Sequence, residues 1–129
     1  MGVGEDELYG FILEHVDTVP HLEALLLLWN SRPRVWDTTE MAARLFVNES
    51  GAHSILSDLT RHGLVIAQAD TPVRYLYLSS PENDRLIEAV AYAYRTDLIR
   101  ISTTIHSKAS SGVREFARAF RFKRKGKTP

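Results

Sequence analysis

Residues 38–65, TTEMAARLFVNESGAHSILSDLTRHGLV, have the pattern of two short helices joined by a turn and followed by a strand. Small and apolar residues share one face of the first helix, at Met41, Ala42 and Leu45. We expect Thr38 or Thr39 to cap this helix and Val47 to close it. The stretch therefore predicts a helix-turn-helix, an arrangement that suggests binding before it suggests catalysis.

The second helix is predicted over residues 50–62, after a polar break at residues 48–50. Its apolar stripe has the i, i+3, i+4 and i+7 spacing of a buried helix face, formed by Ala52, Ile55, Leu56 and Leu59. Gly63 can take the positive φ that ends a helix, and strand-forming residues follow it at once. The chain therefore passes directly from this helix into a strand.

A β-hairpin is predicted after the second helix. Residues 73–78, VRYLYL, alternate with period two, so that the tyrosines face one side and the leucines the other. Residues 64–69 can pair with this strand across a turn at residues 70–72, Asp-Thr-Pro, whose proline keeps the tip from extending the ladder. The predicted fold is mainly α with a small β-hairpin wing, which is a winged helix-turn-helix.

Residues 19–108 resemble the MarR-like winged helix-turn-helix proteins of bacterial transcription regulation. The resemblance is carried by Met41-Ala42-Ala43-Arg44-Leu45, Leu56, Leu59 and Gly63-Leu64-Val65. It implies a homodimer that inserts the second helix, residues 50–62, into the major groove of double-stranded DNA. It also implies that the wing, residues 70–74, touches the DNA backbone around Arg74.

The outward face of residues 50–62 supplies the candidate DNA contacts. Small polar side chains and one imidazole would meet base edges, at Ser50, Gly51, His53, Ser54, Ser57 and Asp58. Arg61 and Arg74 would contact phosphates. His53 projects where a ring nitrogen could donate to a base or phosphate, and a solvated surface histidine is the alternative. Because Arg61 is the only cation on this face and lies at its far end, DNA shape could supply the specificity.

The balance of charge keeps a second function open. Sixteen basic and sixteen acidic residues give a formal net charge of zero, whereas non-specific DNA affinity comes largely from Lys and Arg. The first twenty residues contain no Lys or Arg, while residues 108–127 contain eight basic residues against Glu115 alone. The alternative is a winged-helix protein-interaction module without DNA binding, which Glu49 and Asp58 on the exposed helix face favour.

The chain divides into four predicted segments. These are an N-terminal acidic helix (1–18), the winged helix-turn-helix domain (19–80), a long dimerisation helix with a break after it (81–112), and a basic C-terminal helix or tail (113–129). Within the first two segments, helices are expected over residues 5–17 and 21–31. Residues 32–36 would form an extended link to the wing, and both tryptophans would pack in the core.

The long helix is predicted to start at Ser80-Pro81-Glu82 and to continue unbroken to Lys108. Apolar residues at spacings of three and four form a candidate dimer interface: Ile87, Val90, Tyr94, Leu98, Ile101 and Ile105. The alternative is that this helix folds back over its own core with the amino-terminal helix.

Three interpretations of residues 113–125 compete. The segment could track DNA phosphates, lie on an anionic membrane, or dock on the acidic first helix. Phe116 and Phe120 need burial, which favours docking, so no membrane partner is predicted.

The sequence indicates no enzyme. It has no phosphate-binding loop, nucleophile elbow or paired carboxylate motif, and its five histidines form no close ligand pair, so neither cofactor nor metal is predicted. The lack of cysteine, of a signal peptide and of a long apolar run favours a cytoplasmic protein. A small-molecule effector stays open as a further partner, in a pocket between the long helix and the wing domain lined by Trp29, Tyr92 and Tyr94.

Overall fold

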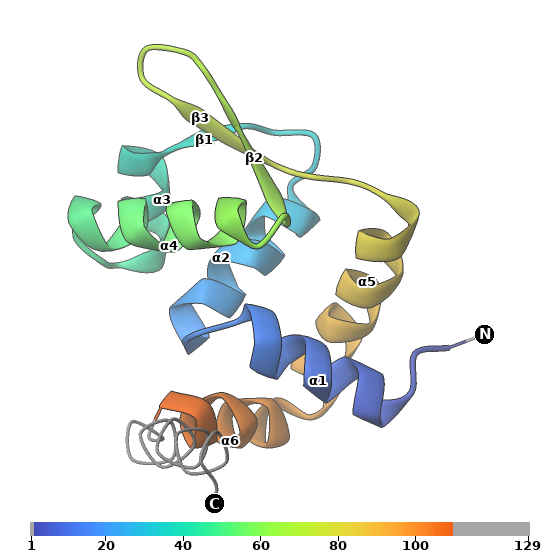
Figure 1. Ribbon diagram of the computed structural model, residues 1–129. Helices are drawn as coiled ribbons and strands as arrows, with labels where there is room; N and C mark the ends of the chain where they lie inside the picture. The colour runs from blue at the N-terminus through green and yellow to red at the C-terminus, as the bar shows by residue number, and fades with distance from the viewer. Residues whose placement is uncertain (1, 110–129) are drawn as a thin grey trace, which may run out of the picture.

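The computed structural model describes residues 2–109. Its elements, in chain order, are α1 (Glu5–His15), α2 (Val19–Asn30), β1 (Trp36–Asp37), α3 (Thr38–Leu45), α4 (Glu49–Arg61), β2 (Val65–Gln68), β3 (Arg74–Tyr77), α5 (Pro81–Thr96) and α6 (Leu98–Ala109). In Figure 1 the sheet, α3 and α4 lie toward one end of the molecule, and α1 and α6 lie at the other. Within residues 2–109, no helix is long and apolar enough to cross a membrane. The prediction for residues 113–129 lies outside the described residues.

The first helix of the helix-turn-helix is α3, and its cap is Asp37. The Asp37 carboxylate accepts a hydrogen bond from the Glu40 N–H at 2.8 Å, and the Glu40 carboxylate accepts one from the Asp37 N–H at 2.9 Å. This reciprocal capping box satisfies two backbone donors, which explains why the helix starts earlier than a cap at Thr38 or Thr39 would place it. The helix ends at Leu45 rather than Val47, because Phe46 adopts a left-handed conformation with φ of 59°.

The second helix, α4, follows the predicted pattern closely. Its N-cap is Asn48, whose side chain accepts a hydrogen bond from the Gly51 N–H at 2.6 Å. The predicted apolar stripe is buried at all four positions: Ala52, Ile55, Leu56 and Leu59. Gly63 follows the helix with φ of 77°, a conformation that favours glycine. The turn between α3 and α4 therefore holds the two helices against a shared core.

The wing is part of a three-stranded antiparallel sheet in the order β1-β3-β2. Tyr75 and Tyr77 of the central strand β3 are buried, as their alternation predicts. The predicted extended link contributes β1, in which Trp36 lies opposite Tyr75 and is itself buried. Trp29 is half-buried and packs edge-on against Tyr77, with ring centroids 5.1 Å apart. The sheet therefore ties the wing to the end of α2.

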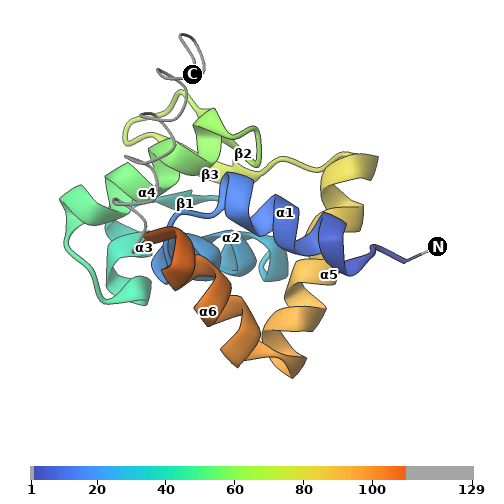
Figure 2. The same cartoon turned by 60° about the horizontal axis from the view of Figure 1, so that its bottom comes forward.

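The prediction of one helix unbroken to Lys108 is wrong. Helix α5 ends at Thr96, Asp97 leaves the helical conformation with φ of −149° and ψ of 50°, and α6 begins at Leu98. The break turns the chain so that α6 lies along α1 (Figures 1 and 2). Ion pairs of Glu5 with Arg100 and of Glu7 with Arg85 join α1 to α6 and to α5. Packing against α1 therefore accounts for a break that no glycine or proline marks.

The same turn corrects most of the predicted dimer interface. Four of its six residues are fully buried within a single chain: Ile87, Val90, Ile101 and Ile105. A side chain with no surface exposed in one chain has none left to bury against a second copy, so these four belong to the protomer core. Tyr94 is half-buried and Leu98 is exposed, and their part in an interface stays a prediction.

Candidate functional site

The outer face of α4 carries mostly small, polar side chains that are exposed. Ser50, His53 and Ser54 are exposed on the side away from the buried stripe. Ser57 is half-buried, and its Oγ lies 3.5 Å from His53 Nε2. This face therefore offers hydroxyl and imidazole groups, which can each donate or accept a hydrogen bond, but no cation in its first two turns.

Gly51 has a structural role on this face. A Cβ at this position would lie 3.1 Å from Asn48 Oδ1 and 3.7 Å from Val47 Cβ. The glycine therefore allows the cap of α4 to close tightly onto the backbone. A contact between Gly51 and DNA stays a prediction.

Asp58 does not point outward as predicted. Its Oδ2 lies 2.8 Å from His21 Nε2 on α2, and its Oδ1 accepts a hydrogen bond from Arg61 Nη2 at 2.7 Å. Burial alone would raise the pKa of Asp58, but the hydrogen bonds from His21 and Arg61 outweigh it and hold that pKa below its ordinary value. Both oxygens of the Asp58 carboxylate thus have hydrogen-bond partners within its own chain, so we exclude Asp58 from the side chains proposed to contact bases.

The wing exposes its tip and carries one arginine. Residues 69–73 are exposed, and Figure 1 shows the hairpin extending away from α4 at one end of the molecule. Arg74 is half-buried at the start of β3, in register with Asp37 on one side and Gln68 on the other. The tip itself contains Asp70. A phosphate contact at the wing would therefore fall at the base of the tip, on Arg74.

Two arginines that the sequence analysis did not select lie beside the sheet. The Arg32 guanidinium lies 3.5 Å from the centre of the Trp29 ring, and that of Arg34 lies 3.7 Å from the centre of the Trp36 ring. Such stacking holds a guanidinium in place without consuming all of its donors. The available sequence signal was two arginines lying between two tryptophans over residues 29–36. Both arginines are exposed beside the sheet.

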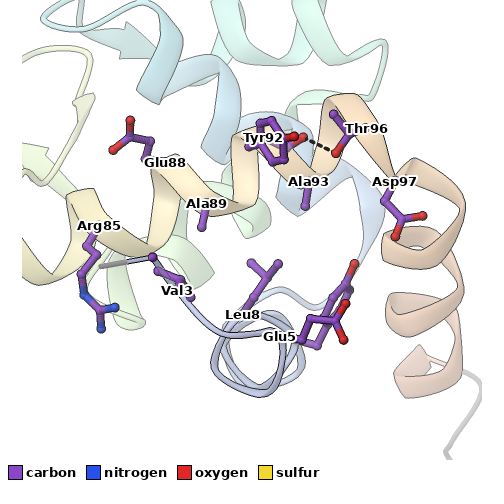
Figure 3. Close-up of a pocket in the computed structure, with 12 residues that line it drawn as sticks. Val3, Glu5, Leu8, Arg85, Glu88, Ala89, Tyr92, Ala93, Thr96 and Asp97 are labelled. Atoms are coloured by element: carbon purple, nitrogen blue, oxygen red, sulfur yellow. Dashed lines mark hydrogen bonds between the residues drawn. The ribbon is translucent and has the colours of Figure 1, made fainter.

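A cavity of about 530 Å³ lies between α1 and α5 (Figure 3). Its lining includes Leu8, Tyr9, Ala89 and Tyr92. Of the three aromatic residues predicted to line an effector pocket, Tyr92 alone lines this cavity. Trp29 packs on Tyr77 instead. The cavity therefore lies between helices at the amino-terminal side, rather than against the wing domain.

Asp17, His21 and Asp58 bring their ligand atoms within 4.8 Å of one another. They come from the segment before α2, from α2 itself and from α4. Sequence spacing does not reveal this group, because tertiary packing brings its members together from three separate segments. The group joins α4 to the junction of α1 and α2.

Comparison with models of known protein families gives no match, and neither does comparison with curated proteins. Solved structures do match. A MarR family protein from Bacillus stearothermophilus aligns at a TM-score of 0.53 and 21% identity, covering 91% of this chain and 79% of that one. The MepR–DNA complex from S. aureus aligns at a TM-score of 0.55 and 14% identity, covering 79% of this chain and 86% of that one. The MarR family transcriptional regulator SPO1453 from Silicibacter pomeroyi aligns at a TM-score of 0.52 and 18% identity, covering 89% of this chain and 85% of that one.

These observations define the protein as a winged helix-turn-helix protein. More particularly, the chain has the fold of the MarR family transcriptional regulators, which confirms the predicted architecture.

Proposed function

We propose that this protein is a homodimeric, DNA-binding transcriptional regulator. The observation that carries the proposal is the exposed polar face of α4 beside an exposed hairpin, on a fold shared with MepR, which was solved bound to DNA. Helix α4 enters the major groove, and the wing contacts the DNA backbone.

The contacts follow from exposure. Ser50, His53 and Ser54 meet base edges, with Ser57 and Gly51 behind them. Arg74 and Arg61 contact phosphates, and Arg61 does so while it holds Asp58. Since residues 108–129 carry eight of the sixteen basic residues, the tail supplies much of the cation density.

The dimer forms on the apolar side chains that a single chain leaves in water. Three such side chains lie around the junction of α5 and α6: Tyr92 at 61% exposed, Leu98 at 46% and Ile99 at 82%. Tyr92 also lines the cavity beside α1 (Figure 3). Exposed apolar side chains gathered in one region mark an interaction site, and a second copy that covers them would place two α4 helices at a fixed spacing.

DNA binding is tested by fluorescence anisotropy with pooled duplexes from the surrounding genome, at two salt concentrations. Ser54→Glu should abolish binding, because it sets a carboxylate against the groove, while Ser107→Glu on α6 should bind as the wild type does. Arg74→Ala should weaken binding to all sequences. It should also make the dependence of log binding constant on log salt concentration shallower by about one unit, because one phosphate contact is lost. Equal loss in both glutamate variants would contradict a contact through α4.

The chain that ends at Gly112 tests the alternative function. Submicromolar binding by this shorter chain would show that the winged helix itself reads DNA. Loss of DNA binding when the tail is removed, or no binding by either chain, would favour the protein-interaction module. The charge of residues 32–80 supports that module, because five arginines are balanced by five acidic residues. These are Arg32, Arg34, Arg44, Arg61 and Arg74 against Asp37, Glu40, Glu49, Asp58 and Asp70.

A further inference from the structure

We propose that Asp17, His21 and Asp58 form a binding site for a divalent first-row transition-metal ion such as Zn²⁺, which fastens α4 to the start of α2.

The distances suit one shared ion. The three ligand atoms lie within 4.8 Å of one another, and one pair, His21 Nε2 and Asp58 Oδ2, is 2.8 Å apart. Zinc binds histidine nitrogen and carboxylate oxygen at about 2.0–2.2 Å, so two of its ligand atoms lie roughly 3 Å apart. His21 and Asp58 therefore already lie close to the separation that one shared ion requires, and the Asp17 ligand atom lies within 4.8 Å of both.

The outer atoms of two ligands are already held. His21 Nδ1 lies 2.7 Å from Thr18 Oγ1, and Asp58 Oδ1 is bonded by Arg61. Metal-bound histidines and carboxylates commonly have such outer partners, which fix the ring and leave the other atom for the ion. His21 is only 7% exposed, so its ring cannot turn away into solvent.

The proton balance is simple. Without an ion, the Thr18 hydroxyl donates to His21 Nδ1, and the Nε2 proton is donated to Asp58. When an ion binds Nε2, the neutral ring changes tautomer: the Nε2 proton leaves to solvent, a proton from solvent takes the place on Nδ1, and no net proton is released. The Thr18 oxygen then accepts from Nδ1–H as well as from the His21 backbone N–H, which it already accepts at 3.3 Å. A hydroxyl has two acceptor lone pairs, so it can make both contacts.

The donor set selects the class of ion. One imidazole and two carboxylates suit divalent zinc, manganese or iron, whereas a chain without cysteine offers no thiolate for copper(I). Two negative charges also match a divalent cation. His62 lies one turn beyond Asp58 on α4, and its Nδ1 is 3.1 Å from that of His15. A second pair of imidazoles thus joins the end of α4 to the end of α1.

The site has a consequence for DNA that rests on the proposed function. Asp58 lies one helical turn after the exposed Ser54. An ion that binds Asp58, His21 and Asp17 would therefore fix the angle of the DNA-facing helix relative to α2.

The test is calorimetric titration of the chelator-treated full chain with ZnCl₂. We expect one ion per chain, with affinity at least tenfold weaker in Asp17→Asn and in His21→Asn. The matched control is His53→Asn, which removes an exposed histidine from α4 and should leave affinity unchanged. Zinc should also raise the Tm of the wild type, but not that of Asp17→Asn.

Two results would overturn the site. One is no zinc binding by the wild type. The other is binding that survives in both Asp17→Asn and His21→Asn but falls in His53→Asn, which would place the ion on surface histidines. Because Asp17→Asn leaves the contact between His21 and Asp58 intact, misfolding of the His21 variant would not spoil the test. The readout involves no DNA, so its failure leaves the proposed function untouched.

Discussion

The winged-helix part of the chain, α2 to β3, and the helices α1, α5 and α6 differ in how their shapes are specified. In the winged-helix part, the helices start on side chains that bond the backbone locally, Thr18, Asp37 and Asn48. The decisive break between α5 and α6 has no such marker, and exposed apolar side chains gather beside it. The starts of α2, α3 and α4, like that of α5 at Ser80, are specified by local sequence, whereas the break between α5 and α6 depends on distant contacts and, in our account, on a second copy.

The largest expected effect comes from a pair of substitutions on α6. Ile101→Asp places a charge in a fully buried site and should lower the free energy of unfolding by about 4 kcal/mol or more. Thr103→Asp, two residues later and exposed, should change it by less than about 0.5 kcal/mol. Urea denaturation monitored by circular dichroism measures both.

Ile99→Asp tests the dimer. By light scattering it should be a monomer where the wild type is a dimer, because a carboxylate replaces an apolar contact. Ile66→Asp, an equivalent change at an exposed site on β2, should remain dimeric. A dimer that persists in Ile99→Asp would move the interface away from this junction.

Within the winged-helix part, Leu56→Ala should cost about 3 kcal/mol, because it empties a fully buried site on α4. Chemical denaturation gives the value. If the loss is much smaller, the two helices of the motif do not share the tight core that the structure shows.

The contact between α4 and α2 predicts a pH dependence. The pKa of Asp58 is below its ordinary value of about 3.9, so its carboxylate stabilises the fold above that pH, and the contribution is lost as pH falls through the lowered pKa. Asp58→Asn should therefore cost about 2 kcal/mol at pH 7 and progressively less below pH of about 4. Stability curves of both chains from pH 7 to 3 check this, and a gap that stays constant with pH would contradict it.

The smallest effect concerns the start of α3. Asp37→Ala removes the capping box and should cost about 1 kcal/mol. Thr38→Ala, at the cap position that the sequence first suggested, should cost less than half as much. Thermal unfolding of the two variants compares them directly, and a larger loss in Thr38→Ala would identify Thr38 rather than Asp37 as the cap of α3.

The sequence predicted most of the winged-helix part, because its signals are local. The stripe of α4, Gly63 and the paired tyrosines of β3 each lie in one short segment, and the structure confirms them. The cap was misplaced because three adjacent residues can each cap a helix, and only Glu40 decides among them.

What the sequence could not predict depends on contacts between distant segments. Ile101 and Ile105 have the spacing of an interface, but the turn at Asp97 packs α6 against α1 and both side chains are fully buried within one chain. Asp58 follows the serines of the outer helix face in the sequence, yet its carboxylate is hydrogen-bonded to His21, 37 residues away. Its own helix gave no sign of this partner.

The most direct test of the central claim is an NMR titration of the ¹⁵N-labelled full chain with a duplex selected from the genomic pool. Our account predicts that the largest amide shifts fall in residues 49–57 and 69–74, on α4 and the wing. Shifts confined to α1, α5 and residues beyond 109, with α4 unchanged, would contradict a winged helix that reads DNA.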